Sequence, residues 1–208
     1  GVIVRTAAGG ASEDALWMAR YSRDLYARLE QETGLSTGFK QVGYLQLATT
    51  PRSDESYRRE TAYMRSVGMT KEILSPREVA DLVPLMRTED VIHGFWTPDE
   101  GRANPVDVTM SLAKGARMKG ARIVENTEVT GFAIERGRVV GVHTERGTVE
   151  CEKVVLAAGL WGRELAAKAG VTVPLQAAEH YYLLTEEIEG VTPEGVPVIE
   201  DPEAYGYY

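Results

Sequence analysis

The stretch from Val154 to Trp161 has the residue types and spacing of a ligand site. It begins with an unbroken apolar run and ends in Ala157-Ala158-Gly159 before Leu160 and Trp161. A run that is apolar at every position is typical of a strand covered on both faces, as in parallel sheets with helices above and below. Ligands of open α/β sheets bind at the carboxyl ends of such strands, where a glycine lets a cofactor approach the backbone. The stretch therefore predicts either a cofactor contact at Gly159 or an ordinary strand-to-helix turn.

The composition limits the classes of protein to which the chain can belong. Its 208 residues, 43% hydrophobic and 26% charged, suit one large or two small globular domains. A formal net charge of -8 and a pI near 5.1 argue against nucleic acid or an anionic membrane surface as the main partner. The single Cys151 excludes an internal disulfide and a multi-cysteine metal site. We expect a cytoplasmic protein without a metal, in which Cys151 is a structural strand residue.

Helices and strands can be placed from caps, breakers and apolar spacing. Helices are predicted at 12–33, about 55–67, 75–83 and 105–119, the third and fourth with a cap residue followed by proline. Strands are predicted at 39–47, 91–97, 121–125 and 153–158, and three alternating strands at about 129–135, 139–144 and 147–151 form a meander. The order is thus helix, strand, three-stranded meander and buried strand.

Six stretches that span nearly the whole chain carry a family resemblance. They are Leu25 to Gly34, Gly43 to Ala48, Leu74-Ser75-Pro76, Gly101 to Pro105, Val154 to Trp161 and His180-Tyr181-Tyr182. In this order they resemble the FAD-binding domain of flavoenzymes of the D-amino acid oxidase type, nearest to the dimethylglycine and sarcosine dehydrogenases and oxidases. The resemblance implies an α/β (α+β) fold with an incomplete FAD-binding parallel-sheet domain, which contains the three-stranded meander, and part of an antiparallel substrate-domain sheet.

The resemblance also implies how the domains divide. Residues 1–38 and 101–175 would belong to the FAD-binding domain, and residues 39–100 and 176–208 to the substrate domain. The glycine fingerprint of that family lies before the first matched stretch, and Gly9-Gly10-Ala11 lacks the required spacing. We therefore expect the chain to be a piece of a larger protein and to hold only part of FAD by itself.

The functional residues are implied by the same resemblance. Glu128 and Val129 would lie beside the adenine, with the backbone of Val129 pairing to the ring edge. Ala158, Gly159 and Trp161 would lie over the pyrophosphate and ribose, although Trp161 could equally be a core aromatic. His180 and Tyr182 are the expected catalytic residues. Alternation along a strand at 179–185 would place these two side chains on one face, and an ordinary aromatic strand is the alternative.

Other candidate residues have weaker claims. The two remaining histidines, His93 and His143, occupy strand positions and are expected to be structural. Arg5 and Arg102 are candidates to anchor a substrate carboxylate only by default, because the arginine that follows the corresponding tyrosine strand in the family is missing here.

The implied activity is flavin-dependent oxidation of a small secondary or tertiary amino acid or N-methyl amine. A hydride would pass to FAD and leave an iminium that water hydrolyses. A glycine- or proline-type amino acid oxidase, an NAD-dependent enzyme and a flavin-less, non-catalytic subunit of the same fold remain alternatives. Oxygen and an electron-transfer protein are both open as electron acceptor.

Overall fold

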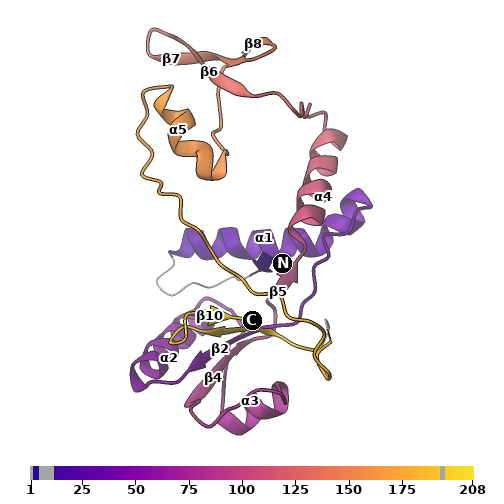
Figure 1. The fold of residues 1–208 in the computed structure, drawn as a ribbon, viewed down its shortest axis with the longest axis vertical. Coiled ribbons are helices and arrows are strands. Elements are labelled where there is room, and N and C mark those ends of the chain that lie inside the picture. The colour runs from indigo at the N-terminus through magenta and orange to yellow at the C-terminus, as the bar shows by residue number, and fades with distance from the viewer. Residues whose placement is uncertain (1, 5–11, 193–194) are drawn as a thin grey trace. The chain divides into compact units, whose positions relative to one another are not determined.

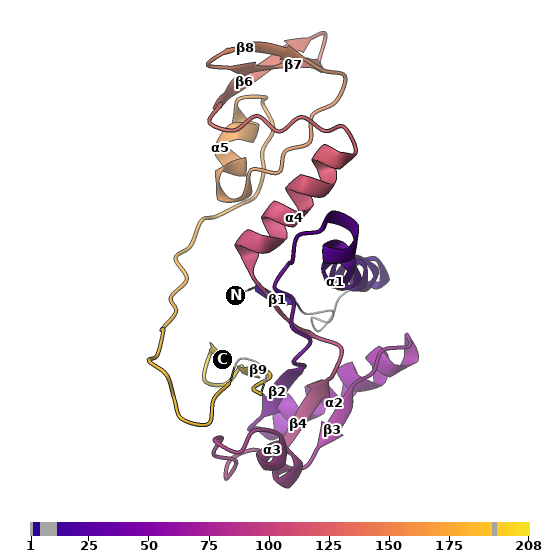
Figure 2. The ribbon, with the colours of Figure 1, turned by 90° about the vertical axis from the view of Figure 1, so that its right-hand side faces the viewer.

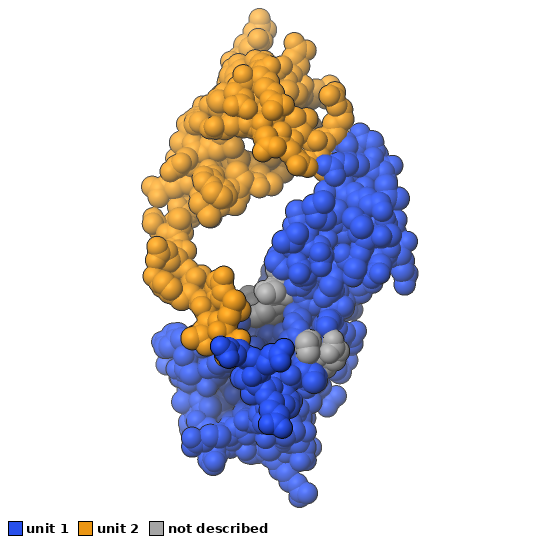
Figure 3. Space-filling model, turned by 45° about the vertical axis from the view of Figure 1, so that its right-hand side comes forward, with its two compact units in different colours: residues 1–121, 186–208 blue, residues 122–185 orange. Residues whose placement is uncertain are grey.

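The computed structural model describes residues 2–4, 12–192 and 195–208, which divide into two compact units. Unit 1 comprises residues 1–121 and 186–208, and unit 2 comprises residues 122–185 (Figure 3). Arg5 and Gly9-Gly10-Ala11, which the sequence analysis considered, lie outside the described residues.

Unit 1 is built around a mixed five-stranded sheet with the order β10-β9-β2-β4-β3 (Figure 1). Its strands are β2 (Tyr44–Ala48), β3 (Glu72–Leu74), β4 (His93–Thr97), β9 (Val198–Asp201) and β10 (Gly206–Tyr207). β2 pairs antiparallel with β4 on one side and parallel with β9 on the other. Strands from both proposed substrate-domain segments, 39–100 and 176–208, therefore share one sheet.

The predicted helices of unit 1 are confirmed. They are α1 (Glu13–Thr33), α2 (Pro51–Ser66), α3 (Pro76–Leu82) and α4 (Pro105–Met118). The Ser12 hydroxyl accepts from the Ala15 N–H at 3.3 Å, and Gly34 ends α1 in the left-handed region at φ 70°. α2 begins earlier than predicted, because Pro51 occupies the first helical turn behind the cap residue Thr50 and does not break the chain.

Helices cover both faces of this sheet. Phe95 of β4 packs edge-on against Tyr57 of α2, with ring centroids 5.4 Å apart. At the preceding position, a Cβ built on Gly94 would lie 2.5 Å from Val79 of α3. Because successive strand residues face opposite sides, α2 and α3 lie on opposite faces (Figure 2). The core on the α3 face consists of Leu45, Leu47, Val79, Val83, Val91 and Ile199.

Elsewhere in unit 1, α1 packs against α4, and a two-stranded ribbon joins distant parts of the chain. This ribbon pairs β1 (Val2–Val4) antiparallel with β5 (Gly101–Ala103). Arg102, the default carboxylate anchor, lies in β5 and exchanges two backbone hydrogen bonds with Lys40, at 2.8 and 3.1 Å.

An ion cluster joins the start of α2 to the start of β4. The Asp54 carboxylate binds His93 Nδ1 at 2.8 Å with one oxygen and the Arg58 Nε at 2.8 Å with the other. Partial burial raises the pKa of Asp54, but hydrogen bonds and charge from Arg58 and His93 outweigh it and leave the pKa below its usual value of 3.8. His93 thus has local structural partners.

This cluster makes a pH-dependent contribution to stability. A folded-state pKa below the unfolded value contributes stability that is fully present above the unfolded pKa and is lost as the pH falls through the folded one. In urea unfolding of the full-length protein, the difference between wild type and Asp54→Asn is expected to be fully present at about pH 5 and to shrink below about pH 4. The exposed neighbour Glu55→Gln is the matched control, and a difference for Asp54→Asn that stays constant down to pH 3 would contradict the assignment.

Unit 2 contains the predicted meander, which is confirmed. Its strands β6 (Val129–Glu135), β7 (Arg138–Thr144) and β8 (Gly147–Glu150) lie in the order β6-β7-β8, and Arg136 and Gly137 turn between the first two with positive φ. The Nδ1 atom of His143 lies 2.9 Å from the Thr148 hydroxyl on the neighbouring strand. Cys151 follows β8, is half-buried, and donates its N–H to Val140 at 3.0 Å.

Three strands that the sequence predicted do not form. Residues 121–125, 153–158 and 179–185 have no strand assignment, and Val155 is 89% exposed although its run predicts burial on both faces. A strand exists only through hydrogen bonds to a neighbour, and no strand among the described residues pairs with these stretches. Apolar residues of this kind are typical of buried strands. In the described part of the chain, however, no neighbouring strand pairs with these three stretches.

Candidate functional site

The predicted site residues all lie within unit 2, and two of them line one cavity. Val129 begins β6, an edge strand of the meander. Trp161 ends η1, a single 3₁₀ turn from Gly159 to Trp161 that leads directly into α5 (Gly162–Ala167). The two residues face a cavity of about 390 Å³, whose other lining residues are Glu128, Glu164, Leu165 and Lys168. The structure thus brings together an adenine-side and a ribose-side candidate from positions 32 residues apart.

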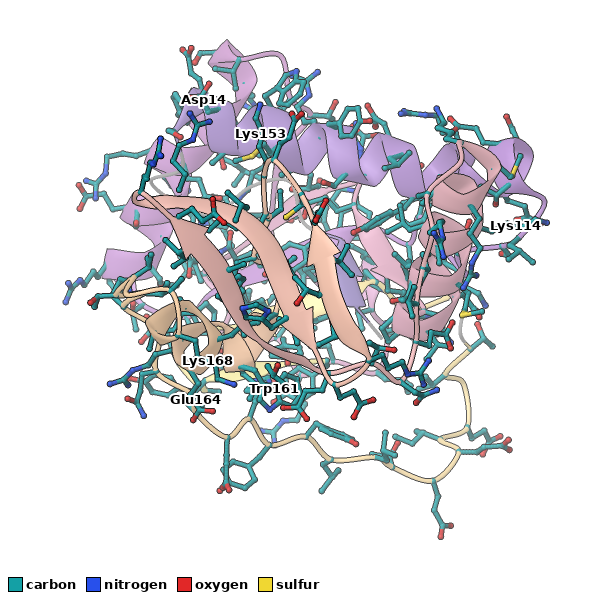
Figure 4. All side chains as sticks on the ribbon, turned by 90° about the horizontal axis from the view of Figure 1, so that it is seen from above. Asp14, Lys114, Lys153, Trp161, Glu164 and Lys168 are labelled. Atoms are coloured by element: carbon teal, nitrogen blue, oxygen red, sulfur yellow. The ribbon has the colours of Figure 1, made fainter. Side chains whose placement is uncertain are left out.

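Two charged lining residues, Glu164 and Lys168, were missed by the sequence analysis. Glu164 is three residues after Trp161, and Lys168 is four residues after Glu164, spacings that place residues on one side of a helical segment. Figure 4 shows Trp161, Glu164 and Lys168 gathered at one end of unit 2. Glu128, the other charged lining residue, was expected beside the adenine together with Val129. The helical spacing after Trp161 was therefore a signal from which two of these residues could have been found.

Gly159 has a backbone conformation that favours glycine. Its φ is 54°, and no heavy atom lies within 4 Å of the position that a Cβ would occupy. Ala158 precedes it as the cap residue of η1. No side chain therefore covers the Gly159 backbone at this position. A ligand that approaches the main chain closely requires such an uncovered position. The following helix α5 has six residues.

The expected catalytic residues lie on an extended segment without strand pairing. His180 and Tyr182 are exposed, Tyr182 to 81%, and no regular structure places them together or beside the cavity at Trp161. Between them, the Tyr181 hydroxyl donates to Glu179 at 2.5 Å, and this hydrogen bond raises the pKa of Tyr181. The geometry therefore leaves the assignment of His180 and Tyr182 as a prediction from the sequence.

The residues around the cavity fit one end of a dinucleotide. The cavity volume lies within the range of small-molecule sites, about 300–1,000 Å³, and its walls combine an indole and aliphatic groups with a few polar ones. Val129 lies on an edge strand, whose outer backbone groups are the kind that pair with a heterocycle edge. Among the described residues no group of histidine, cysteine or carboxylate side chains could hold a metal ion, and no helix is long and apolar enough to cross a membrane.

Curated proteins with related sequences include oxidases and dehydrogenases of methylated amines. The chain is 42% identical over 186 residues to 4-methylaminobutanoate oxidase (formaldehyde-forming) of Paenarthrobacter nicotinovorans, covering 88% of this chain and 22% of the relative. It is 35% identical over 195 residues to human mitochondrial sarcosine dehydrogenase, covering 91% and 21%. It is also 36% identical over 192 residues to the mitochondrial pyruvate dehydrogenase phosphatase regulatory subunit of Mus musculus, covering 91% and 22%. The chain thus spans about a fifth of the length of these relatives.

A solved structure and a family model agree with these relatives. L-proline dehydrogenase from P. horikoshii superimposes with a TM-score of 0.79 at 27% identity, over 96% of this chain and 52% of that one. The model of the FAD dependent oxidoreductase family matches residues 1–208. The predicted α/β fold and the resemblance to dimethylglycine and sarcosine dehydrogenases are therefore confirmed. The chain belongs to the FAD-dependent oxidoreductases of the D-amino acid oxidase type, whose members are flavoproteins.

Proposed function

We propose that this chain is part of a flavin-dependent enzyme that oxidises a small secondary or tertiary amino acid or N-methyl amine, similar to dimethylglycine or sarcosine. The observation that carries the proposal is the cavity shared by Val129 and Trp161, next to the uncovered backbone of Gly159, in a chain of this family. Relatives that are named for oxidising methylated amines support the same substrate class.

The residues have separate proposed roles. Val129 and Trp161 would hold the adenine and ribose, and Ala158 and Gly159 would let the pyrophosphate approach the main chain. Bound FAD supplies the hydride acceptor, which no protein side chain can provide. His180 and Tyr182 would orient the amine and hold it without its proton, because a hydride leaves readily only from a neutral amine.

The first test is the visible absorption spectrum of the full-length protein. Flavin bands that bleach without oxygen on addition of sarcosine, N,N-dimethylglycine or 4-methylaminobutanoate would support the proposal. A colourless protein that takes up no added FAD would overturn it in favour of a non-catalytic subunit. That alternative has its own support, because one relative is named as a regulatory subunit. Proline and glycine belong in the same panel, because one similar structure is an L-proline dehydrogenase.

Gly159→Val tests the proposed backbone contact. A β-branched side chain at φ 54° is strained, and its methyl groups would stand where the cofactor is expected to approach. We expect the purified full-length variant to retain less than about a tenth of the wild-type flavin, because each 1.4 kcal/mol of lost binding free energy raises the dissociation constant of FAD about tenfold and purification removes weakly held cofactor. Flavin content would be measured from the ratio of visible to ultraviolet absorbance.

Gly170→Val is the matched control for this test. Gly170 is also in unit 2, has φ 73°, and also has no heavy atom within 4 Å of a built Cβ, but it has no proposed contact with FAD. Equal loss of flavin in both variants would mean that backbone strain, and not a cofactor contact, explains the result.

The cellular compartment belongs to the proposal as well. The single cysteine fits a reducing compartment such as the cytoplasm, while the human sarcosine dehydrogenase relative is mitochondrial by name. Fractionation of the native cells, followed by immunodetection of the protein, would test the cytoplasmic assignment.

A further inference from the structure

A cavity of about 820 Å³ opens on the α3 face of the sheet in unit 1, beside the loop that joins α3 to β4. Its floor is part of the hydrophobic core of that face and is formed by Leu47, Val83, Val91 and Ile199. Leu85 and Met86 of the loop also line it, and Leu85 is 58% exposed. The core of this face is therefore accessible from the cavity.

The strand register brings polar groups to the same cavity. Leu45 of β2 pairs with Ile199 of β9, and successive strand residues alternate between the two faces, so Leu47 and Asp201 lie on the face that carries Ile199. Tyr208 exchanges two backbone hydrogen bonds with Ile199, at 2.7 and 2.9 Å, and also lines the cavity. The β9 side of the cavity thus combines an apolar floor with a carboxylate and a phenol.

The charged side chains around the cavity, here called its rim, are mostly acidic. They are Arg87, Glu89, Asp90 and Asp201. Arg87 and Glu89 approach to 3.6 Å with side chains that are 90% and 74% exposed, so this pair offsets its own charges. Asp201 accepts a hydrogen bond from the uncharged Ala204 N–H at 3.1 Å. Within the residues that the structure describes, neither Asp90 nor Asp201 forms an ion pair, and the rim keeps their negative charges.

The shape and the charges of the cavity together limit what it can bind. Its volume lies within the range of small-molecule sites, about 300–1,000 Å³. An apolar group gains free energy by covering the floor, because it removes that surface from water. A cationic group gains it at the rim, whereas an anion is repelled there. The complementary ligand therefore has an apolar body and a cationic end.

We propose that this cavity is a binding site for an organic cation with an aliphatic or aromatic body, whose charged end lies between Asp90 and Asp201. The proposal goes beyond the proposed function and does not depend on it. The cavity lies wholly within unit 1, whereas the residues proposed to contact FAD and the substrate amine belong to unit 2. Small amino acids such as sarcosine have no apolar body that could cover the floor, so the ligand of this site differs from the proposed substrate.

Three ligands with the same body and different charges test the site. They are 4-phenylbutylammonium, neutral 4-phenylbutan-1-ol and anionic 4-phenylbutanoate. Isothermal titration of the full-length protein at low ionic strength is expected to show that the ammonium ligand binds about tenfold more tightly than the alcohol, and that the carboxylate binds most weakly.

The double variant Asp90→Asn with Asp201→Asn tests the rim. It should bring the ratio of the ammonium and alcohol affinities close to one, while the asparagine oxygen at position 201 can still accept from the Ala204 N–H. Asp81→Asn is the matched control, because Asp81 is exposed on α3 and does not line the cavity. A ratio that is unchanged in the double variant, or an equal fall in Asp81→Asn, would overturn the proposal.

Leu85→Ala tests whether the apolar body lies in this cavity. It is expected to weaken all three ligands severalfold and to keep the ratio between them, because it removes apolar surface and no charge. Leu112→Ala, at a 39% exposed position of α4 away from the cavity, should change nothing. Unchanged affinities in Leu85→Ala would overturn the proposal. So would the absence of saturable binding of any of the three ligands, which would indicate that another protein segment fills the cavity.

Discussion

Replacement of His180 or Tyr182 by phenylalanine in the full-length protein is expected to lower turnover of an N-methyl amine about 100-fold, the scale of a lost acid–base group. The flavin content should stay nearly unchanged, since the proposed adenine and pyrophosphate contacts are made elsewhere in unit 2. The physical reason is the protonation state of the substrate. An imidazole and a phenol can hold the amine neutral, and phenylalanine keeps the ring but loses the polar atoms. Anaerobic stopped-flow reduction, followed by flavin absorbance, measures the step directly.

The residue between them provides the control. Tyr181→Phe removes the same kind of hydroxyl, but one that donates to Glu179. This variant should reduce the flavin at a rate close to that of the wild type. Unchanged rates in both His180→Phe and Tyr182→Phe would remove these residues from the active site. A loss in Tyr181→Phe as large as in Tyr182→Phe would indicate that the whole segment, and not particular polar atoms, affects the rate.

Lys71→Met is expected to reduce the free energy of unfolding by about 3–5 kcal/mol, the cost of leaving one member of a buried ion pair without its partner. The Glu60 side chain, 11% exposed, would keep its charge without the ammonium at 2.6 Å, and the Gln46 carbonyl would lose its donor. Urea unfolding of the full-length protein, followed by circular dichroism, gives the change in midpoint.

An exposed ion pair in α2 is the comparison for Lys71. Arg59 and Glu55 approach to 2.5 Å, but their side chains are 69% and 72% exposed, so Arg59→Met should change stability by less than about 1 kcal/mol. The double variant Lys71→Met with Glu60→Met should recover part of the loss, because two apolar side chains need no partners. Equal effects of Lys71→Met and Arg59→Met would show that burial does not decide the strength of these pairs.

Local signals predicted the elements of this fold better than they predicted its sheets. Ser12, Ser75 and Asn104 mark the starts of α1, α3 and α4, because a capped helix satisfies its backbone within one segment. The three-stranded meander could also be predicted, because each of its strands pairs with the strand next to it in the sequence. The stretch 153–158 was predicted as a strand, but it has no partner among the described residues, and its sequence could not reveal this.

The candidate site, too, was predicted from the sequence only in part. Trp161 and Val129 were named in advance, and the structure places both on one cavity, whereas Glu164 and Lys168 follow from helical spacing that the sequence analysis did not use. The hydrogen bonds that Tyr44 and Gln46 donate to Glu200 could not be predicted. These contacts depend on the parallel pairing of β2 with β9, and the sequence of neither strand indicates which strand it pairs with.

The pairing of β2 with β9 sets an expected order of folding. β2 can join β4 and β3 as soon as residues 44–97 have left the ribosome, and Lys71 can then reach both Glu60 and Gln46. Glu200 is 154 residues beyond Gln46, so β9 must close a long loop before it docks at an edge of the sheet that already exists. The Lys71–Gln46 contact would thus already be in place when β9 docks, and the β9 side would be the last part of this sheet to assemble.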